Sequence, residues 1–352
     1  MFTYLKNLFV PSSKIDSLEG LSGLSNTEAI LSNLVFEKKV PGIAVTITKD
    51  NQVVIQKGLG YADVENKVLV NPKETIFRIA SISKCITGLA LGKMVEEGIV
   101  DFDDSFYKHV PYYPKKKYDF TLRQLASHTA GIRAYRGKEF AMNKSFSIRE
   151  SLEVFQDEPL VFKPGTGYLY NSFDFVLLSL AMQEASGIPF EAYVQEKILE
   201  PLGMLNTYFD LSRNKNQAKF YTKTPMGFKT AIAVNNFYKL AGGGYLSTSD
   251  DIAKLGQAIL EQKLLKSKTY KQLLTSQKVN GKLSYYGLGF QVSQDKYGRC
   301  FVGHVGSSVG AYSNFFVYPD EKITVSILVN CTDSNVQNEL DHIIAEQLNM
   351  HF

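Results

Sequence analysis

The alternation of apolar and polar residues predicts β-strands near both ends of the chain. Residues 43–47 alternate in this way, and residues 53–56 form a second such segment after a Lys49-Asp50-Asn51 turn, which is typical of a β-hairpin. Towards the C-terminus, alternation or a short apolar run predicts further strands at residues 290–293, 299–303, 311–318 and 322–329. The two ends of the chain therefore supply the strands.

Apolar residues at helical spacing predict a mostly helical middle region. Helices are expected at residues 26–39, 82–97, 173–185, 249–262 and 334–348. Residues 1–20 are predicted to form a loose N-terminal extension, and residues 21–352 a single domain. Strands at both ends with helices between them predict an α+β fold, in which one antiparallel sheet from the two termini is flanked by helices.

The composition is that of a globular protein, because 44% of the 352 residues are hydrophobic and 21% are charged. The net charge is only +4, so there is no electrostatic case for nucleic acid as a partner. The longest strongly apolar stretch, Phe175–Met182, is too short to span a membrane, and residues 1–10 lack the apolar run of a signal peptide. We therefore expect no integral membrane segment and a cytoplasmic location, with the periplasm as the alternative.

The strongest chemical signal is an S-x-x-K motif, Ser81-Ile82-Ser83-Lys84, at the start of a predicted helix. Residues three apart on a helix share a face, so Lys84 is predicted to point the same way as Ser81. A lysine that is buried or flanked by another cation loses its proton readily and can then take one from a hydroxyl group. In isolation, the same two residues would also fit a helix cap and a solvated surface lysine.

Two further segments place polar side chains next to small residues. Tyr170 follows a Pro-Gly turn and precedes a predicted helix, where a tyrosine can carry a proton if a cation lowers its pKa. His304 and Gly306 follow a predicted strand, and the glycine would let a substrate approach the backbone closely. Taken singly, these residues would also fit a packed aromatic ring and a tight turn with a structural histidine.

In their order and spacing, Ser81-x-x-Lys84, Tyr170-x-Ser172 and His304-Val305-Gly306 resemble the motifs of serine β-lactamases and penicillin-binding proteins. Longer phrases resemble the class C β-lactamase-like branch: FRIASISK at residues 77–84, LASHTAGI at 125–132, PGT at 164–166 and GGGYLST at 242–248. Residues 127–135 are also similar to the mitochondrial β-lactamase-like serine protease group. The resemblance covers about residues 25–348 and implies a β-lactamase/transpeptidase-like fold.

The resemblance implies a serine hydrolase of the class C β-lactamase-like family that works through an acyl-Ser81 intermediate. Lys84 would activate Ser81 and share its proton with Tyr170, which would protonate the leaving group. The backbone N–H groups of Ser81 and Ser307 would form the oxyanion hole. No cofactor and no metal is implied. The residues that would bind the substrate are Ser172, His304, Gly306 and Ser307.

Two departures from the family pattern bear on the substrate. His304 stands where the wider family has a lysine that binds the substrate carboxylate, and its charge is expected to depend on pH near neutrality. Ser172 stands where an asparagine commonly holds the amide carbonyl of the substrate. We therefore expect a peptidase or esterase rather than an efficient β-lactamase. The candidate small-molecule or peptide substrates are D-amino-acid peptides, short peptides, small esters and β-lactams.

Other functions are consistent with parts of the sequence. One is a non-catalytic binding or scaffold protein that retains the fold, although such a protein has no physical need to keep Ser81, Lys84 and Tyr170 together. Residues 306–310 match the G-x-S-x-G pattern of a nucleophile elbow, but a strand rather than a helix is predicted after them. The five histidines are dispersed, which argues against a metal site, and His128 is interpreted as a hydrogen-bonded turn residue.

Overall fold

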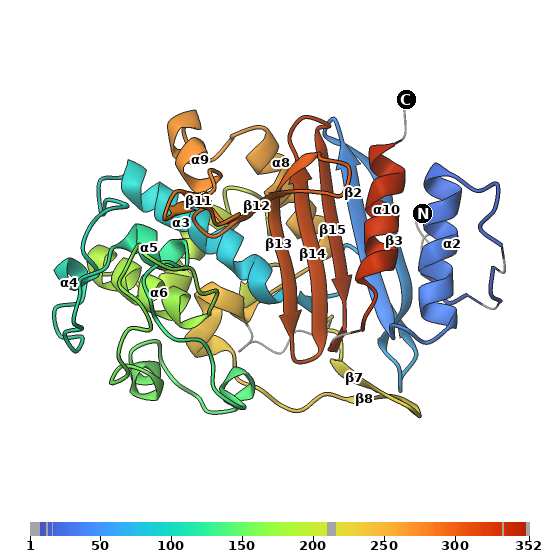
Figure 1. The fold of residues 1–352 in the computed structure, drawn as a ribbon. Helices are drawn as coiled ribbons and strands as arrows, with labels where there is room; N and C mark the ends of the chain where they lie inside the picture. Colours follow the sequence, from blue (N-terminus) through green and yellow to red (C-terminus); the bar gives the residue numbers. More distant parts are fainter. Residues whose placement is uncertain (1–7, 12, 16, 210–215, 333, 350–352) are drawn as a thin grey trace.

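A central β-sheet combines strands from the two ends of the chain (Figure 1). The computed structural model describes residues 8–11, 13–15, 17–209, 216–332 and 334–349. In spatial order, the sheet runs through β1 (Leu8–Phe9), β3 (Gln52–Asp63), β2 (Gly42–Lys49), β15 (Ile323–Val329), β14 (Ala311–Tyr318), β13 (Cys300–Ser308) and β12 (Gln291–Gln294), and the short β4 (Val68–Leu69) also pairs with β3. The N-terminal strands β2 and β3 thus lie beside the C-terminal strands.

The two halves of the sheet meet between β2 and β15. These strands pair antiparallel along their length, from Ile43 opposite Val329 to Lys49 opposite Ile323. Nearly every residue of both strands is buried. Because successive side chains point to opposite faces of a sheet, both faces must be covered at this point. The predicted α+β arrangement, with one antiparallel sheet built from both termini, is confirmed.

Part of the predicted N-terminal extension joins the edge of the sheet. β1 lies within residues 1–20 and runs parallel to β3, with Leu8 opposite Gly58. The side chain of Asn33 also exchanges two hydrogen bonds with the backbone of Ile15, each 2.9 Å long. The residues of the extension that lie outside the described part of the chain are 1–7, 12 and 16.

Helices cover both faces of the sheet. On one face, α2 (Gly23–Phe36) and α10 (Gln337–Leu348) lie side by side (Figure 1), and their apolar side chains pack with those of β2, β3 and β15. On the other face, α8 (Ser249–Leu260) packs against β2, β14 and β15. A Cβ atom on Gly256 would lie 2.2 Å from the Thr324 side chain, so glycine lets α8 approach the sheet closely.

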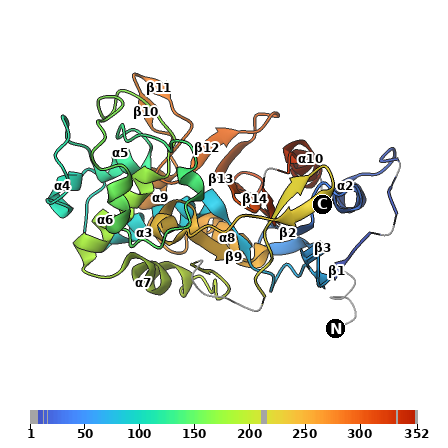
Figure 2. The same cartoon turned by 90° about the horizontal axis from the view of Figure 1, so that it is seen from below.

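The middle of the chain is mostly helical and lies beside the sheet rather than over its faces (Figures 1 and 2). Its helices are α3 (Ser83–Glu96), α4 (Phe106–His109), α5 (Leu122–Ala126), α6 (Phe173–Ser186), α7 (Phe190–Val194) and α9 (Ser267–Leu273). α3 is buried on almost all sides, because α6, α7 and α9 pack around it. Among the described residues, no helix is long and apolar enough to cross a membrane.

Short strands connect the helical region to the sheet. β5 (Phe77–Arg78) and β6 (Tyr208–Phe209) pair with the two edges of β9 (Tyr245–Ser247). The other small strands are β4 (Val68–Leu69), β7 (Tyr221–Thr224), β8 (Gly227–Thr230), β10 (Lys278–Val279), β11 (Lys282–Leu283) and β16 (Cys331–Thr332). The pairing of β5 with β9 matters most for the site, because β5 leads directly into the S-x-x-K motif.

β13 is longer than the sequence pattern predicts. It continues beyond its predicted end at residue 303 to Ser308, so His304 and Gly306 lie inside a strand rather than in a turn. β14 pairs with it antiparallel after a short turn. Residues 306–310 therefore do not form a nucleophile elbow, which needs a helix after its serine.

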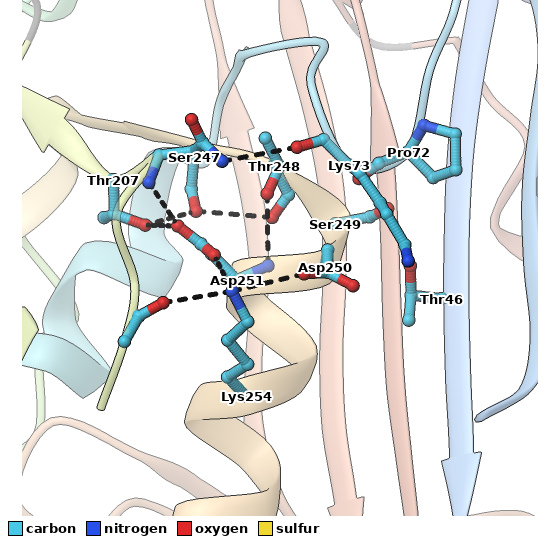
Figure 3. Close-up of polar contacts among 12 residues, drawn as sticks. Thr46, Pro72, Lys73, Thr207, Ser247, Thr248, Ser249, Asp250, Asp251 and Lys254 are labelled. Carbon is cyan, nitrogen blue, oxygen red and sulfur yellow. Dashed lines mark hydrogen bonds and ion pairs between the residues drawn. The ribbon is translucent and has the colours of Figure 1, made fainter. Parts of the chain in front are cut away.

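A buried polar cluster fixes the start of α8 (Figure 3). The Thr248 hydroxyl caps the helix by accepting a hydrogen bond from Asp251 N at 3.1 Å. The Asp251 carboxylate is fully buried. It accepts hydrogen bonds from Asn206 N at 2.7 Å, from the Thr207 hydroxyl at 3.1 Å and from the Lys254 ammonium at 2.6 Å. The cluster thereby ties α8, and β9 immediately before it, to the segment that leads into β6.

Candidate active site

The candidate nucleophile lies in a short turn between a strand and a buried helix. β5 leads into a 3₁₀ turn at Ala80–Ile82, and α3 begins only at Ser83, so Ser81 precedes the α-helix instead of starting it. Ala80 has a φ of 47°, which is uncommon for a residue with a side chain, and the Ser83 hydroxyl donates to its carbonyl oxygen at 2.7 Å. The turn holds Ser81 at the N-terminus of α3, where the helix dipole favours negative charge.

Lys84 lies one helical turn from Ser81 and is completely buried. It donates a hydrogen bond to the carbonyl oxygen of Gly242 at 2.6 Å, and its Nζ lies 3.4 Å from Ser81 Oγ. Burial lowers the pKa of Lys84 to about 7, although the neighbouring Cys85 thiol and Asp174 carboxyl oppose this shift. A large fraction of Lys84 is therefore the neutral amine near pH 7, and this form can accept a proton.

Tyr170 contacts the same serine oxygen. Its hydroxyl donates to Ser81 Oγ at 2.7 Å, and its ring centroid lies 4.9 Å from Lys84 Nζ. Burial raises the pKa of Tyr170, and the hydrogen bond with Ser81 lowers it only in part. The structure thus differs from the expectation that a nearby cation lowers this pKa. The phenol stays protonated at neutral pH and is a proton donor towards Ser81.

The start of α6 is held by Asn171, which follows Tyr170. The Asn171 side-chain oxygen accepts a hydrogen bond from Asp174 N at 2.8 Å, and its Nδ2 donates to Ile132 O at 3.2 Å and to Asp174 Oδ2 at 2.7 Å. Asn171 is buried and committed to these bonds. Ser172 is therefore the polar residue at this helix end that remains accessible, and it lines the cavity beside Ser81.

His304 is buried and does not line the cavity beside Ser81. It is 1% exposed, its Nδ1 lies 2.6 Å from Val305 O, and its Nε2 lies 3.0 Å from the Tyr286 hydroxyl. Burial and, secondarily, the positive charge of Lys84 lower the pKa of His304 to about 3. The imidazole is therefore neutral near pH 7, in contrast to the expectation of a charge that changes around neutrality.

Gly306 brings β13 close to the nucleophile turn. A Cβ atom at this position would lie 2.2 Å from Ser313 Oγ and 2.7 Å from Ile79 O, which is too close for a side chain. Gly306 therefore allows β13 to pack closely against the turn that carries Ser81. The sequence analysis expected instead that this glycine lets a substrate approach the backbone. This packing places the next residue, Ser307, on the wall of the same cavity as Ser81.

Ser81, Ser172 and Ser307 line one cavity of about 70 Å³. The structure thus brings these residues together with Lys84 and Tyr170, and leaves His304 and Gly306 behind the wall. The GGGYLST phrase at residues 242–248 contains two of the lining residues, Gly242 and Gly243. No sequence motif marks the lining residues Tyr135, Phe140 and Lys239. The other lining residues are Ala80, Tyr135, Phe140, Lys239, Gly242, Gly243 and Ser308.

A buried acid–imidazole pair lies behind Tyr170. His128 Nδ1 is 2.9 Å from Asp174 Oδ2, both side chains are fully buried, and the His128 ring centroid lies 4.6 Å from that of Tyr170. Burial raises the pKa of Asp174 and lowers that of His128, so both groups are driven towards their neutral forms. His128 is a hydrogen-bonded residue with a φ of 61°, as its turn interpretation predicts, whereas no sequence pattern marks Asp174.

Metal binding finds no support in the geometry. Across the ranges that the structure describes, no group of three or more His, Cys, Asp or Glu residues is placed to hold a metal ion. The polar groups that converge on Ser81 are instead a lysine amine and a tyrosine hydroxyl. A lysine amine and a tyrosine hydroxyl are groups that can move a proton at a serine oxygen.

Comparison with models of protein families identifies the family to which this chain belongs. The family model described as beta-lactamase matches residues 27–349, which is most of the chain. The chain belongs to the beta-lactamase family. The resemblance drawn from the motifs is therefore confirmed, and Ser81, Lys84 and Tyr170 all fall inside the region that matches this family of serine hydrolases.

Relatives of this beta-lactamase-family chain come from distant organisms. It is 30% identical to the human serine beta-lactamase-like protein LACTB, mitochondrial, over an alignment of 404 positions, gaps included, that covers 86% of this chain and 73% of that protein. The octameric penicillin-binding protein homologue from Pyrococcus abyssi matches with 30% identity and a TM-score of 0.77, covering 88% of this chain and 73% of that one. The D-amino acid amidase from Ochrobactrum anthropi SV3 shares the fold, with a TM-score of 0.80, 20% identity and coverage of 91% and 97%. The predicted β-lactamase/transpeptidase-like fold is confirmed.

Proposed function

We propose that this protein cleaves an amide or ester through an acyl-Ser81 intermediate. The main support is the convergence of two groups on one oxygen: Tyr170 donates to Ser81 Oγ at 2.7 Å, and Lys84 Nζ lies 3.4 Å from it. Burial lowers the pKa of Lys84 to about 7, so this lysine can act as a base at neutral pH. A protein that only binds a ligand has no need of this arrangement.

In the proposed acylation step, neutral Lys84 accepts the hydroxyl proton of Ser81 while Oγ bonds to the carbonyl carbon of the substrate. The carbonyl oxygen takes the negative charge, which the backbone N–H groups of Ser81 and Ser307 would stabilise. Tyr170 then donates its proton to the leaving nitrogen or oxygen as the bond to the carbonyl carbon breaks, and Lys84 returns a proton to Tyr170. The step yields acyl-Ser81 and a free amine or alcohol.

Deacylation would use the same groups in the reverse sense. A water molecule attacks the acyl carbon while Lys84, assisted by Tyr170, takes its proton. The bond to Ser81 Oγ then breaks, and the proton passes to this oxygen. One water molecule is consumed, one carboxylic acid is released, and the side chains return to their starting protonation states.

The sealed His304 supports amides and esters over β-lactams as substrates. A penicillin carries a carboxylate, and a neutral, buried imidazole offers it no positive charge. Val305, the next residue along β13, has no hydroxyl group to donate. We therefore place this protein beside the peptidase- and esterase-like members of the class C-like branch. Short peptides, D-amino-acid peptides and small esters are the first substrates to test.

Intact-mass measurement after incubation with an activated fluorophosphonate and, separately, with a penicillin tests the proposal. We expect a covalent adduct in the wild type and none in Ser81→Ala. The matched control is Ser267→Ala, which removes an exposed hydroxyl remote from the cavity and should leave labelling intact. A folded wild-type protein that reacts with neither probe would contradict the acyl-enzyme proposal and favour a binding or scaffold role.

A further inference from the structure

The free edge of β13 beside Ser81 is short, and this feature restricts the leaving group, an inference that rests on the proposed function. We propose that the enzyme releases a leaving group of about one residue, and that the Gln291 side chain sets this limit. The protein then removes the last residue, or a small alcohol or amine, from the end of a substrate and does not cut within a long chain.

Backbone hydrogen bonds show which edge of β13 faces the substrate. In an antiparallel strand, the N–H groups of alternate residues point to the same edge. Val305 N donates to Gln291 Oε1 at 3.1 Å on the β12 side, so Ser307 N, two residues further along, points to this side as well. β12, the outer strand at this end of the sheet (Figure 1), pairs with β13 only along residues 300–303. The edge at Ser307, which lines the cavity beside the nucleophile, is therefore open to an extended substrate that binds like an added strand.

The leaving group departs on the side of Gln291. In the proposed mechanism Tyr170 protonates the leaving atom, which must then lie within hydrogen-bond distance of its hydroxyl. The Tyr170 ring centroid lies 5.7 Å from that of His304 and 6.1 Å from that of Tyr286. His304 precedes Ser307 on β13, and Tyr286 forms an antiparallel β-bridge with Gln291. A leaving chain that follows the edge of β13 therefore runs from Ser307 towards Gln291.

The spacing along the strand leaves room for one residue. Because a strand rises about 3.4 Å per residue, Val305 N lies about 7 Å from Ser307 N. The first residue of an extended leaving group covers about half of this distance, and a second would reach the place that the Gln291 side chain occupies. The Gln291 backbone is fixed between Gly303, opposite it on β13, and Tyr286, so it cannot easily retreat.

Three acetate esters test the proposal, with glycolamide, glycolyl-glycinamide and glycolyl-glycyl-glycinamide as the leaving alcohols. Each hydrolysis consumes one water molecule and releases acetic acid and the alcohol, which mass spectrometry quantifies. The esters transfer the same acetyl group and differ by one residue in the leaving group, so differences in kcat/KM report on the leaving-group side alone. For the wild type we expect kcat/KM to fall about tenfold or more from the first ester to the second, because the misfit of even a small group can cost that much.

Gln291→Ala should move the limit by one residue. Removal of the side chain uncovers Val305 N, so kcat/KM for the second ester should rise about tenfold relative to the first. The third ester should stay a poor substrate, because the β12 backbone still covers β13 at Gly303. The matched control is Gln294→Ala on the same strand, which removes an exposed side chain that contacts Cys300 Sγ at 3.5 Å and should keep the wild-type order of the esters.

Equal kcat/KM values for the three esters in the wild type, or a folded Gln291→Ala with the wild-type ratios, would overturn this inference. Failure to hydrolyse even the glycolamide ester, in a protein that the fluorophosphonate labels at Ser81, would overturn it too, since a leaving group of one residue should fit. Absence of labelling at Ser81 would instead overturn the proposed function.

Discussion

At the scale of single residues, burial decides which group can act as the base. Histidine is the usual side chain for proton transfer near pH 7. Here the buried His304 has a pKa of about 3, while burial brings the pKa of Lys84 down to about 7. Desolvation disfavours the charged form of both groups, so the same physical effect removes one base from the neutral range and brings the other into it.

We expect hydrolysis to become faster with rising pH and to level off above about pH 7. The active form is neutral Lys84, whose pKa of about 7 lies below the ordinary 10.5, so the active fraction grows as pH rises through this value. Burial raises the pKa of Tyr170 and Cys85 and lowers those of His128 and His304, which keeps these groups from titrating near pH 7. The measurement is kcat/KM for a small ester from pH 5 to 9. A pH profile of kcat/KM without a rise between pH 6 and 8 would contradict the role of neutral Lys84 as the base.

Asp174 is the other acidic group that interacts with Lys84, and its substitution serves as the control for this profile. Only the ionised form of Asp174 raises the pKa of Lys84, and burial drives Asp174 towards its neutral form, so Asp174→Asn should move the rising limb little, and only to lower pH, without removing it. Loss of the limb in a folded Asp174→Asn variant would assign the titration to Asp174 instead of Lys84.

Removal of the Tyr170 hydroxyl should slow the reaction while the fold remains intact. Tyr170→Phe keeps the ring that packs 4.6 Å from His128, but it removes the donor to Ser81 Oγ. We expect kcat to fall by about 10²–10⁴, the usual contribution of a general acid or base. Tyr168→Phe removes a nearby hydroxyl without a contact to Ser81 and should change kcat less than threefold, about 0.6 kcal/mol. Equal kcat values for the two variants would contradict the role of Tyr170.

Ser81 and Lys84 could be predicted from the sequence because they lie close together along the chain. Ser81 and Lys84 are three apart at the start of a helix, and this spacing alone brings them to one face. The protonation state of His304 could not be predicted, because it depends on burial and on Tyr286, which arrives from a separate segment. The same holds for Phe140, which reaches the cavity from a 3₁₀ turn without a motif.

At the scale of elements, the cap of α8 anchors the strand that supports the nucleophile turn. β9 ends at Ser247, directly before the Thr248 cap, and this same end pairs with β5, with Phe77 opposite Ser247. Disturbance of the cap should therefore lower stability before it alters the chemistry, since none of its residues lines the cavity beside Ser81.

We expect Asp251→Asn to destabilise the protein by about 2 kcal/mol, because it removes the charge of a buried carboxylate that accepts hydrogen bonds from the partly exposed Lys254 and from Asn206 N. Urea unfolding followed by circular dichroism measures the change. Asp250→Asn, at the adjacent and partly exposed residue, should cost no more than about 1 kcal/mol. An Asp251→Asn variant as stable as Asp250→Asn would show that the cluster does not hold the helix.

Periodicity predicts most elements, but contacts between distant segments set their limits. Alternation identifies β2 and β14, because each has one period-two pattern within a short stretch. β13 is predicted too short, since the glycines at 303 and 306 are typical of a turn. Pairing with β14 along residues 302–308 overrides this local preference. Strand order likewise depends on the pairing of β2 with β15, which no local pattern encodes.

At the scale of the whole molecule, the sheet cannot form until both ends of the chain are present. β2 needs β15 as its neighbour, and the two strands are separated by most of the sequence. The ends are also joined by side chains: Glu346 on α10 accepts hydrogen bonds from Gly23 N at 2.6 Å and Asn26 Nδ2 at 2.9 Å. Contacts of this sequence separation slow folding, because closing a long loop costs entropy.

A chain that ends at residue 310 should therefore lack a cooperative thermal transition. It would lose β14 and β15 and leave β2 with β3 on one side but with no partner strand on the other. A chain that begins at residue 21 is the control. It loses β1, which pairs with only one strand at the edge, so it should keep a cooperative transition and melt only a few degrees lower. Cooperative melting of the chain that ends at residue 310 would contradict the requirement for both ends.

The meeting of both ends in one sheet has a consequence for recombination between relatives. A single crossover anywhere between β3 and β12 gives a hybrid whose sheet combines two parents along the β2–β15 boundary. Two crossovers, one after Asp63 and one before Gln291, exchange the entire helical region as a block and leave the sheet with one parent. Such hybrids would keep Ser81, Lys84 and Tyr170 together. The two parents must then match where the block meets the sheet, at the contact of Gly306 with Ile79 and at the packing of α8 against β2, β14 and β15.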